Sequence, residues 1–450
     1  MEKLLTDAKA RSVRYLADLS SRSVAPSPAA VANLTTFDTP LPSGPSAPIE
    51  TLRLLDEVGS PATFATSGSR YFGFVTGGSL PATLAANWMA STWDQNTVYH
   101  VSSPATSRIE NVAFKWLLDV LQLPPTATGA LVTGATVANL CTIAAARHTL
   151  LKRAGWDVEA DGLFGAPPIT VIVGAEVHPS VTKALGILGL GRNRVVKVPT
   201  DSQGRMRAEL LPPLSGPTLI IAQAGNVNTG TFDPISAICL HARTGTNVWV
   251  HVDGAFGLWA AASPQLQALT TGIAEADSWA TDAHKWLNVP YDSGLAFVRD
   301  PDALRAAMAI TAAYLPASEG QRNPGDYTPE LSRRARGVEV WAALHSLGRS
   351  GLAELIERTC ALARRFATQL SAAGLEILND VVLNQVLVTF GEAERTTRVV
   401  AAIQAEGTCW AGITVWQGRT AMRISVSSWA TTEADVDLSV AAILRVNSTI

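Results

Sequence analysis

The feature that most restricts the fold is a regular alternation of short apolar segments with helical segments between about residues 104 and 285. Strands buried on both faces of a sheet read as continuous apolar runs, and parallel strands need a crossover, usually a helix, between them. The sequence therefore predicts an α/β unit with a mostly parallel, buried sheet. The expected strands are 129–133, 169–173, 218–222, 247–252 and 278–281, and expected helices are 109–121, 136–151 and 181–190.

The pattern changes after about residue 330. Two long helices are expected there, followed by short strands near 385–390 and 420–427 and a closing helix, which is typical of a smaller α+β domain. Residues 1–20 suit an amphipathic helix, and the Ser/Pro/Ala/Thr-rich sequence after it favours an extended arm. We therefore predict an N-terminal helix and arm at 1–55, a large domain at 56–325 and a small C-terminal domain at 326–450.

Charge and cysteine content exclude several classes of function. The 450 residues include 35 basic and 38 acidic side chains, so a net charge of −3 gives no bulk attraction to nucleic acid or to an anionic membrane. The four cysteines lie far apart, which favours neither a disulfide framework nor a metal site and fits a reducing, cytoplasmic location. The N-terminal residues include acidic side chains and have no continuous apolar run, so no signal peptide is expected. Pro and Gly in the uncharged stretch 121–146 argue against a membrane span.

The strongest chemical signal is an aspartate and a lysine at the ends of two expected strands. The apolar run 248–252 delivers Asp253 to a carboxyl edge, where open α/β sheets bind ligands, and Lys285 follows 32 residues later at a similar edge. A lysine amine can form a Schiff base with the aldehyde of pyridoxal phosphate, and a carboxylate can keep its pyridine nitrogen protonated. Taken singly, Asp253 could cap a turn and Lys285 could be solvated.

Two further segments support a cofactor site. Gly134, Ala135 and Thr136 lie between a strand and a helix, where free backbone N–H groups can bind a phosphate, although many strand–helix turns look alike. His178 lies at another such junction, where an imidazole could stack on a flat ring, although a lone histidine is more often structural.

These segments, in this order, resemble the group II pyridoxal-phosphate-dependent amino-acid decarboxylases, from about residue 69 to the C-terminus. The resemblance implies the fold type I architecture, a large domain with a mostly parallel seven-stranded sheet and a smaller α+β domain. The most specific matches are His-Val-Asp at 251–253 and His-Lys-Trp at 284–286. Supporting matches are 71–74, 80–82, 103–105, 133–136, 175–180, 232–234 and 331–334.

The resemblance also implies a role for each matching residue. Lys285 would hold pyridoxal 5'-phosphate, Asp253 would pair with the ring nitrogen, and His178 would stack on the ring. The remaining cofactor contacts would come from Gly134, Ala135, Thr136, Ala255, His284 and Asn228. Tyr314 occupies the position of the family's proton donor to the product carbon; relatives with phenylalanine there tend to make aldehydes. The implied substrate contacts are Phe74, Thr76, Val98 and Arg423, with a structural ion pair as the alternative for Arg423.

Two positions depart from the family. The usual Gly-Thr-Thr run reads Gly-Asn-Val-Asn at 225–228, so a threonine contact to the cofactor is lost or passed to an asparagine. Asp282 stands where relatives usually have asparagine. These differences leave the substrate open, and to a smaller extent the reaction, but they do not weaken the case for the cofactor.

We expect decarboxylation of an L-amino acid with a small or an apolar-to-aromatic side chain. An aminotransferase and an aldolase-type lyase on the same fold remain alternatives, as does a catalytically silent homologue that acts as a binding protein. No metal is expected. The fold usually forms a homodimer with shared active sites, and the low charged content of 16%, against about 25% for average domains, is consistent with a large interface.

Overall fold

The computed structural model describes residues 1–310 and 320–450, so Tyr314 lies outside the described residues. The chain divides into two compact units. The first contains Met1–Thr76, Leu362–Leu378 and Val386–Ile450, and the second contains Gly77–Ala361 and Asn379–Gln385. These units differ from the regions expected at 1–55, 56–325 and 326–450, because the N-terminal residues group with the C-terminal ones and one long helix continues from the second unit into the first.

A seven-stranded sheet forms the centre of the second unit, in the order β1-β7-β6-β5-β4-β2-β3. Strand β7 pairs antiparallel with both of its neighbours, and the other pairings are parallel. The mostly parallel sheet is therefore confirmed. The strands are β1 (Thr128–Val132), β2 (Thr170–Gly174), β3 (Val196–Val198), β4 (Thr218–Gln223), β5 (Val248–Asp253), β6 (Ser278–Asp282) and β7 (Gly294–Val298).

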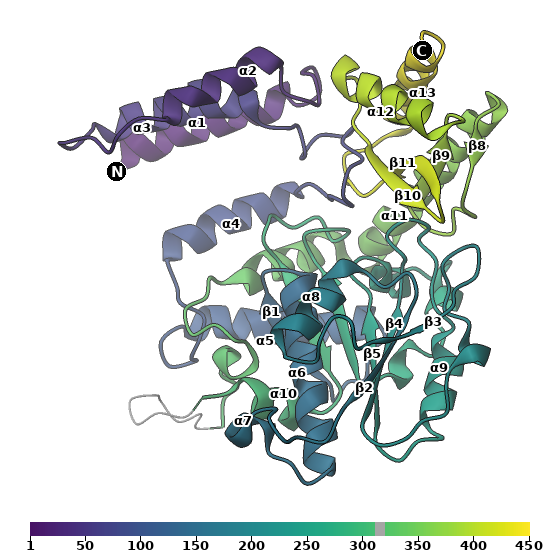
Figure 1. Cartoon of the computed structure of the whole chain (residues 1–450). Coiled ribbons are helices and arrows are strands. Elements are labelled where there is room, and N and C mark those ends of the chain that lie inside the picture. Colours follow the sequence, from purple (N-terminus) through teal and green to yellow (C-terminus); the bar gives the residue numbers. More distant parts are fainter. Residues whose placement is uncertain (311–319) are drawn as a thin grey trace. The chain divides into compact units, whose positions relative to one another are not determined.

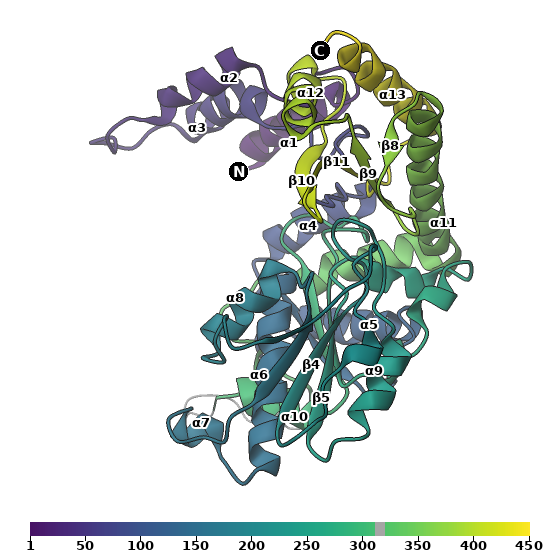
Figure 2. The same cartoon turned by 45° about the vertical axis from the view of Figure 1, so that its right-hand side comes forward.

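Helices cover both faces of this sheet. Helix α6 buries a small-residue face that includes Ala138, Ala144 and Ala145, which lets it approach the strands closely. Figure 2 shows α6 and α8 on one side of β4 and β5, and α9 on the other. The helices of the unit's sheet region are α4 (Pro81–Trp93), α5 (Pro104–Val120), α6 (Ala135–Arg153), α7 (Val158–Asp161), α8 (Pro179–Ile187), α9 (Ile235–Ala242) and α10 (Pro301–Met308).

Helix α11 (Arg336–Ala372) is two helical stretches that meet at Gly348, whose φ of 61° and ψ of −174° are not helical. A positive φ strongly favours glycine, which has no Cβ to clash with the backbone. The break confirms the sequence-based expectation of two successive helices near 333–349 and 351–373.

The first unit is built on a four-stranded sheet in the order β10-β11-β9-β8, which Figure 1 shows beside α12 and α13. Its N-terminal residues form α1 (Glu2–Asp18), α2 (Pro28–Ala32) and α3 (Pro48–Leu54), so the segment expected as an arm is partly helical. The other elements are β8 (Glu376–Ile377), β9 (Gln385–Thr389), α12 (Ala393–Glu406), β10 (Gly412–Trp416), β11 (Arg419–Ser425) and α13 (Glu433–Asn447).

None of the helices within residues 1–310 and 320–450 has the length and apolarity needed to cross a lipid bilayer. All four cysteines are buried, and none of them forms a disulfide.

Candidate active site

The sheet brings Asp253 and Lys285 to the same edge. Asp253 ends β5, and Lys285 follows the end of the neighbouring parallel strand β6 by three residues. The Lys285 Nζ lies 3.0 Å from Oδ2 of Asp282, the last residue of β6. Gly77 packs so closely that a Cβ there would collide with the Lys285 carbonyl. The lysine is thus held at the carboxyl edge, as its position in the sequence predicted.

Asp253 is a buried carboxylate, 3% exposed. Its Oδ1 accepts the backbone N–H of Ala255 at 3.2 Å, and its Oδ2 accepts the Asn139 amide at 3.4 Å. Burial raises the pKa of Asp253, and positive charge on His178 and Lys285 acts in the opposite direction. A carboxylate desolvated in this way is stabilised by a cation, which is what a protonated pyridine nitrogen would be.

A chain of buried hydrogen bonds links Asp253 through Asn139 and His251 to Ser278. The Asn139 amide hydrogens point to Asp253, so Asn139 Oδ1 accepts from His251 Nε2–H at 2.8 Å. Nδ1 of the neutral ring therefore accepts from the Ser278 hydroxyl, 2.9 Å away, and Ser278 Oγ in turn accepts from the Trp249 indole at 2.8 Å. The sequence pointed to the His-Val-Asp motif but not to this chain, because Asn139 lies 112 residues before His251.

His178 lies at the N-terminus of α8. Its Nδ1 accepts the Ser180 backbone N–H at 3.2 Å and lies 2.7 Å from Ser180 Oγ. The Asn139 amide also donates to Ser180 Oγ, at 3.4 Å. His178 is therefore connected through Ser180 and Asn139 to Asp253, and its ring is half-buried. The structure thus brings together the histidine, aspartate and lysine that the sequence singled out.

The expected phosphate loop begins α6. Gly134 precedes the helix and has no side chain to cap it, and the first turn carries no acidic residue. A Cβ at Gly134 would lie 3.3 Å from His284 Cε1, and a Cβ at Gly294 would collide with Gly134. Backbone N–H groups beside an imidazole, in a cradle kept open by glycine, fit a phosphate group.

His284 has a defined tautomer. Its Nδ1 accepts the Ser293 backbone N–H at 3.0 Å, so in the neutral ring Nε2 carries the proton. Burial lowers the pKa of His284. The ring of Tyr291, which the sequence analysis did not identify, packs against His284 with centroids 4.4 Å apart. Tyr291 also lines an open pocket of about 680 Å³ that includes Asn96 and Arg334.

The segment that departs from the family, 225–228, is held by its own side chains. Buried Asn226 Oδ1 accepts the backbone N–H groups of Asn228 and Thr229, at 2.8 Å and 3.2 Å. Asn226 also donates to Gln223 Oε1 at 3.1 Å. Asn226 is thus used within the turn, and Asn228, which is half-buried, stays the candidate for the missing threonine contact.

The expected substrate residues are divided between the two units. In the second unit, Val98 is 4% exposed and accepts the Gly325 backbone N–H at 2.9 Å. In the first unit, Phe74 is 64% exposed and its ring packs on Trp410 with centroids 5.6 Å apart. Thr76 is buried there, and burial lowers the pKa of Arg423 on β11.

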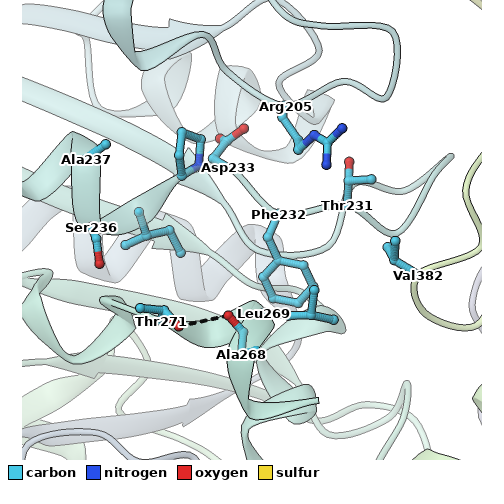
Figure 3. Close-up of a pocket in the computed structure, with 12 residues that line it drawn as sticks. Arg205, Thr231, Phe232, Asp233, Ser236, Ala237, Ala268, Leu269, Thr271 and Val382 are labelled. Carbon is cyan, nitrogen blue, oxygen red and sulfur yellow. Dashed lines mark hydrogen bonds between the residues drawn. The ribbon is translucent and has the colours of Figure 1, made fainter. Parts of the chain in front are cut away.

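A separate pocket of about 370 Å³ in the second unit is lined by none of the expected site residues. Figure 3 shows Asp233, Arg205 and Phe232 among the residues that line this pocket. The Asp233 carboxylate accepts the backbone N–H groups of Met206 and Gln223, at 2.6 Å and 2.7 Å, which indicates a structural role.

Comparison with known proteins identifies the family. The model of the pyridoxal-dependent decarboxylase conserved domain matches residues 62–391. An aromatic-L-amino-acid decarboxylase of Bacillus atrophaeus is 28% identical over 315 residues, which cover 67% of this chain and 63% of that protein. A 4-hydroxyphenylacetaldehyde synthase of Rhodiola rosea is 28% identical over 60% of this chain and 57% of its own length. The match thus spans about three-fifths of these curated relatives.

Solved structures share the fold. Oryza sativa TDC, solved with PLP and tryptamine, superimposes with a TM-score of 0.90 at 22% identity and covers 100% of this chain and 97% of its own. Mouse CSAD gives 0.90 at 23% identity, over 99% of this chain and 98% of its own. These structures confirm the expected large-domain and small-domain architecture.

Proposed function

Because the chain belongs to the pyridoxal-dependent decarboxylase family, with pyridoxal phosphate as its cofactor, we propose that it converts an L-amino acid to the corresponding amine and carbon dioxide. The observation that carries the proposal is the placement of buried Asp253 and of Lys285 at the ends of two neighbouring strands, at one edge of the sheet. Lys285 would hold the cofactor aldehyde, and Ala135, Thr136 and His284 would hold its phosphate.

The cofactor, when bound, supplies an electron sink for the electrons released as the carboxylate leaves. Asp253 would keep a proton on the ring nitrogen, and the hydrogen bond from Asn139 fixes the direction of its carboxylate. His178 would cover the ring, held in orientation through Ser180. Tyr314, from the family resemblance, would give a proton to the product carbon.

The proposed substrate has an apolar or aromatic side chain. Phe74 supports this, because it presents an exposed ring that is fixed against Trp410. Its backbone φ of 53° is unusual for a bulky residue, which indicates that the surrounding structure determines its position. Relatives named as aromatic-amino-acid and tyrosine decarboxylases point the same way. Thr76, Val98 and Arg423 would complete the substrate contacts, and Arg423 would bind the α-carboxylate.

We further propose a homodimer that acts in the cytoplasm. The four buried cysteines, none of them in a disulfide, support a reducing compartment. The N-terminal helices support self-association, because they leave a series of apolar side chains exposed on the single chain.

The first experiment identifies the products. The full-length protein, loaded with pyridoxal phosphate, is incubated with the proteinogenic amino acids, DOPA and 2,4-diaminobutyrate, and the products are measured by mass spectrometry. We expect an amine and carbon dioxide from an aromatic or apolar substrate. Keto acids would indicate an aminotransferase, and cleavage of the side chain would indicate an aldolase-type lyase. Aldehyde with ammonia would indicate an activity like that of the phenylacetaldehyde synthases.

The Lys285→Ala variant tests the site itself. We expect it to lose the absorption band of the lysine-bound cofactor and at least a thousandfold in turnover, because no other group holds the cofactor aldehyde. Lys183→Ala, at an exposed lysine of α8, is the matched control and should keep both. A normal band in Lys285→Ala would refute the assignment.

A further inference from the structure

The carboxylate of Asp282 lies among the groups that would bind the cofactor phosphate. Its Oδ1 accepts the backbone N–H of Ala135, the first residue of α6, at 2.6 Å. Its Oδ2 lies 3.0 Å from Lys285 Nζ and 3.6 Å from His284 Nε2. Asp282 thus contacts Ala135 and lies close to His284, two of the three residues expected to bind phosphate, as well as the lysine.

The surrounding backbone keeps this side chain in place. Asp282 N–H donates to Ala255 at 2.9 Å, and its carbonyl accepts from the Trp259 indole at 3.0 Å. A Cβ at Gly134 would lie 3.6 Å from Asp282 Oδ1, and the Asp282 side chain is 3% exposed. The carboxylate is therefore enclosed at the start of α6 and has little room to turn away.

Charge makes this arrangement unusual for a phosphate site. A phosphate monoester carries between one and two negative charges near neutral pH, and the N-terminus of a helix stabilises an anion. The first turn of α6 has no charged side chain, so the positive charges near Asp282 are Lys285 and, when protonated, His284, and a further carboxylate, Asp253, acts from β5. A bound phosphate would therefore meet a buried like charge beside the N–H of Ala135.

We propose that Asp282 competes with the cofactor phosphate for the N-terminus of α6 and weakens the hold of the protein on that phosphate. Without cofactor, the carboxylate takes the Ala135 N–H and pairs with Lys285. Retention of the cofactor then depends mainly on the covalent link to Lys285, and the chain exchanges its cofactor with solution more readily than a chain with a neutral amide at this position. This inference rests on the cofactor and not on the proposed substrate.

The test compares two ligands that differ only in the phosphate. The dissociation constants of pyridoxal phosphate and of pyridoxal are measured by ultrafiltration, without substrate, on the cofactor-free full-length protein and its Asp282→Asn variant. We expect Asp282→Asn to bind pyridoxal phosphate at least tenfold more tightly and pyridoxal within twofold of the original chain. Inorganic phosphate should also displace pyridoxal phosphate more effectively from the variant.

The comparison of the two ligands distinguishes an effect of Asp282 on phosphate binding from an effect on Lys285. An equal change for both would show that Asp282 acts through Lys285, and an unchanged affinity for pyridoxal phosphate would show no competition; either result overturns the inference. Asp277→Asn, which replaces a hydrogen-bonded aspartate just before β6, is the matched control and should change neither constant. Asp282→Ser replaces Asp282→Asn if the amide variant does not fold. Because no substrate is present, the measured affinities for the cofactor do not depend on which reaction the protein catalyses.

Discussion

His251 is a buried imidazole whose two nitrogens are both used in hydrogen bonds, to Ser278 and Asn139. Burial lowers its pKa from 6.5 to about 3. The unfolded chain therefore binds a proton below pH 6.5 that the folded chain does not bind until about pH 3. The stability contributed by neutral His251 is complete above pH 6.5 and is lost as the pH falls from 6.5 toward 3.

His251→Gln tests this linkage. Glutamine can donate to Asn139 and accept from Ser278 but does not titrate. Each proton contributes about 1.4 kcal/mol per pH unit, so the variant should lose less unfolding free energy between pH 6.5 and pH 5 than the original chain, by up to about 2 kcal/mol. The measurement is urea unfolding at a series of pH values. Parallel pH profiles for the two chains would contradict the prediction.

The same residues show how far the sequence predicts the site. Lys285 and Asp253 could be placed because each follows an apolar strand, and strand ends of a parallel sheet share one edge. The contacts between Asn139 and His251 and between Asp282 and Ala135 could not be placed. They join residues more than a hundred positions apart, and they depend on the depth at which α6 packs against the sheet.

At the scale of elements, Gly348 and Gly351 of α11 have opposite conformational requirements. Gly348 has a φ of 61°, which costs an L-residue roughly 1–2 kcal/mol, although nothing lies within 4 Å of its Cβ position. Gly351 is helical, and its nearest neighbour would be Leu347 at 3.5 Å, an ordinary contact. Alanine should therefore destabilise the folded protein at position 348 and stabilise it at position 351.

We expect Gly348→Ala to lower the unfolding free energy by about 1 kcal/mol and Gly351→Ala to raise it by about 0.5–1 kcal/mol. Urea unfolding measures both, and each variant is the control for the other because they lie in the same helix. A gain in stability from Gly348→Ala would show that α11 can form without its break.

Among the elements, long helices and apolar central strands were predicted best. Strands β4, β5 and β6 agree with expectation within about a residue or two at each end. β4 and β5 are mostly apolar segments followed by loops. Strand β7 was missed. It is an apolar run, Gly-Leu-Ala-Phe-Val, that follows the lysine segment without an intervening helix, and its antiparallel pairing with β1 and β6 follows from the tertiary fold.

At the scale of the whole molecule, residues that are distant in the sequence form one compact unit. The first compact unit joins Met1–Thr76 to C-terminal residues, with Phe72 N–H donating to Trp410 at 2.7 Å. The domain boundaries predicted from the sequence, near residues 55 and 325, follow changes in composition and in the pattern of helices and strands. It could not reveal the N-terminal grouping, because Tyr71 and Trp410, whose rings stack at 5.1 Å, lie more than three hundred residues apart.

The proposed homodimer can be tested at α1, none of whose residues is buried on the single chain. Leu5, Val13 and Leu16 are 56%, 51% and 39% exposed, so polar replacements there should leave the fold of the single chain intact. If α1 packs on a second copy, each replacement removes buried apolar area worth about 1.5 kcal/mol or more.

We therefore expect Leu5→Gln with Val13→Gln to weaken dimerisation at least a hundredfold, since each 1.4 kcal/mol is a factor of about ten. Sedimentation equilibrium measures the dissociation constant, and far-ultraviolet circular dichroism checks the fold. Lys9→Gln, on the same helix, is the control and should change neither measurement. An unchanged sedimentation profile for the double variant would exclude α1 from the interface and leave other surfaces to join the two copies.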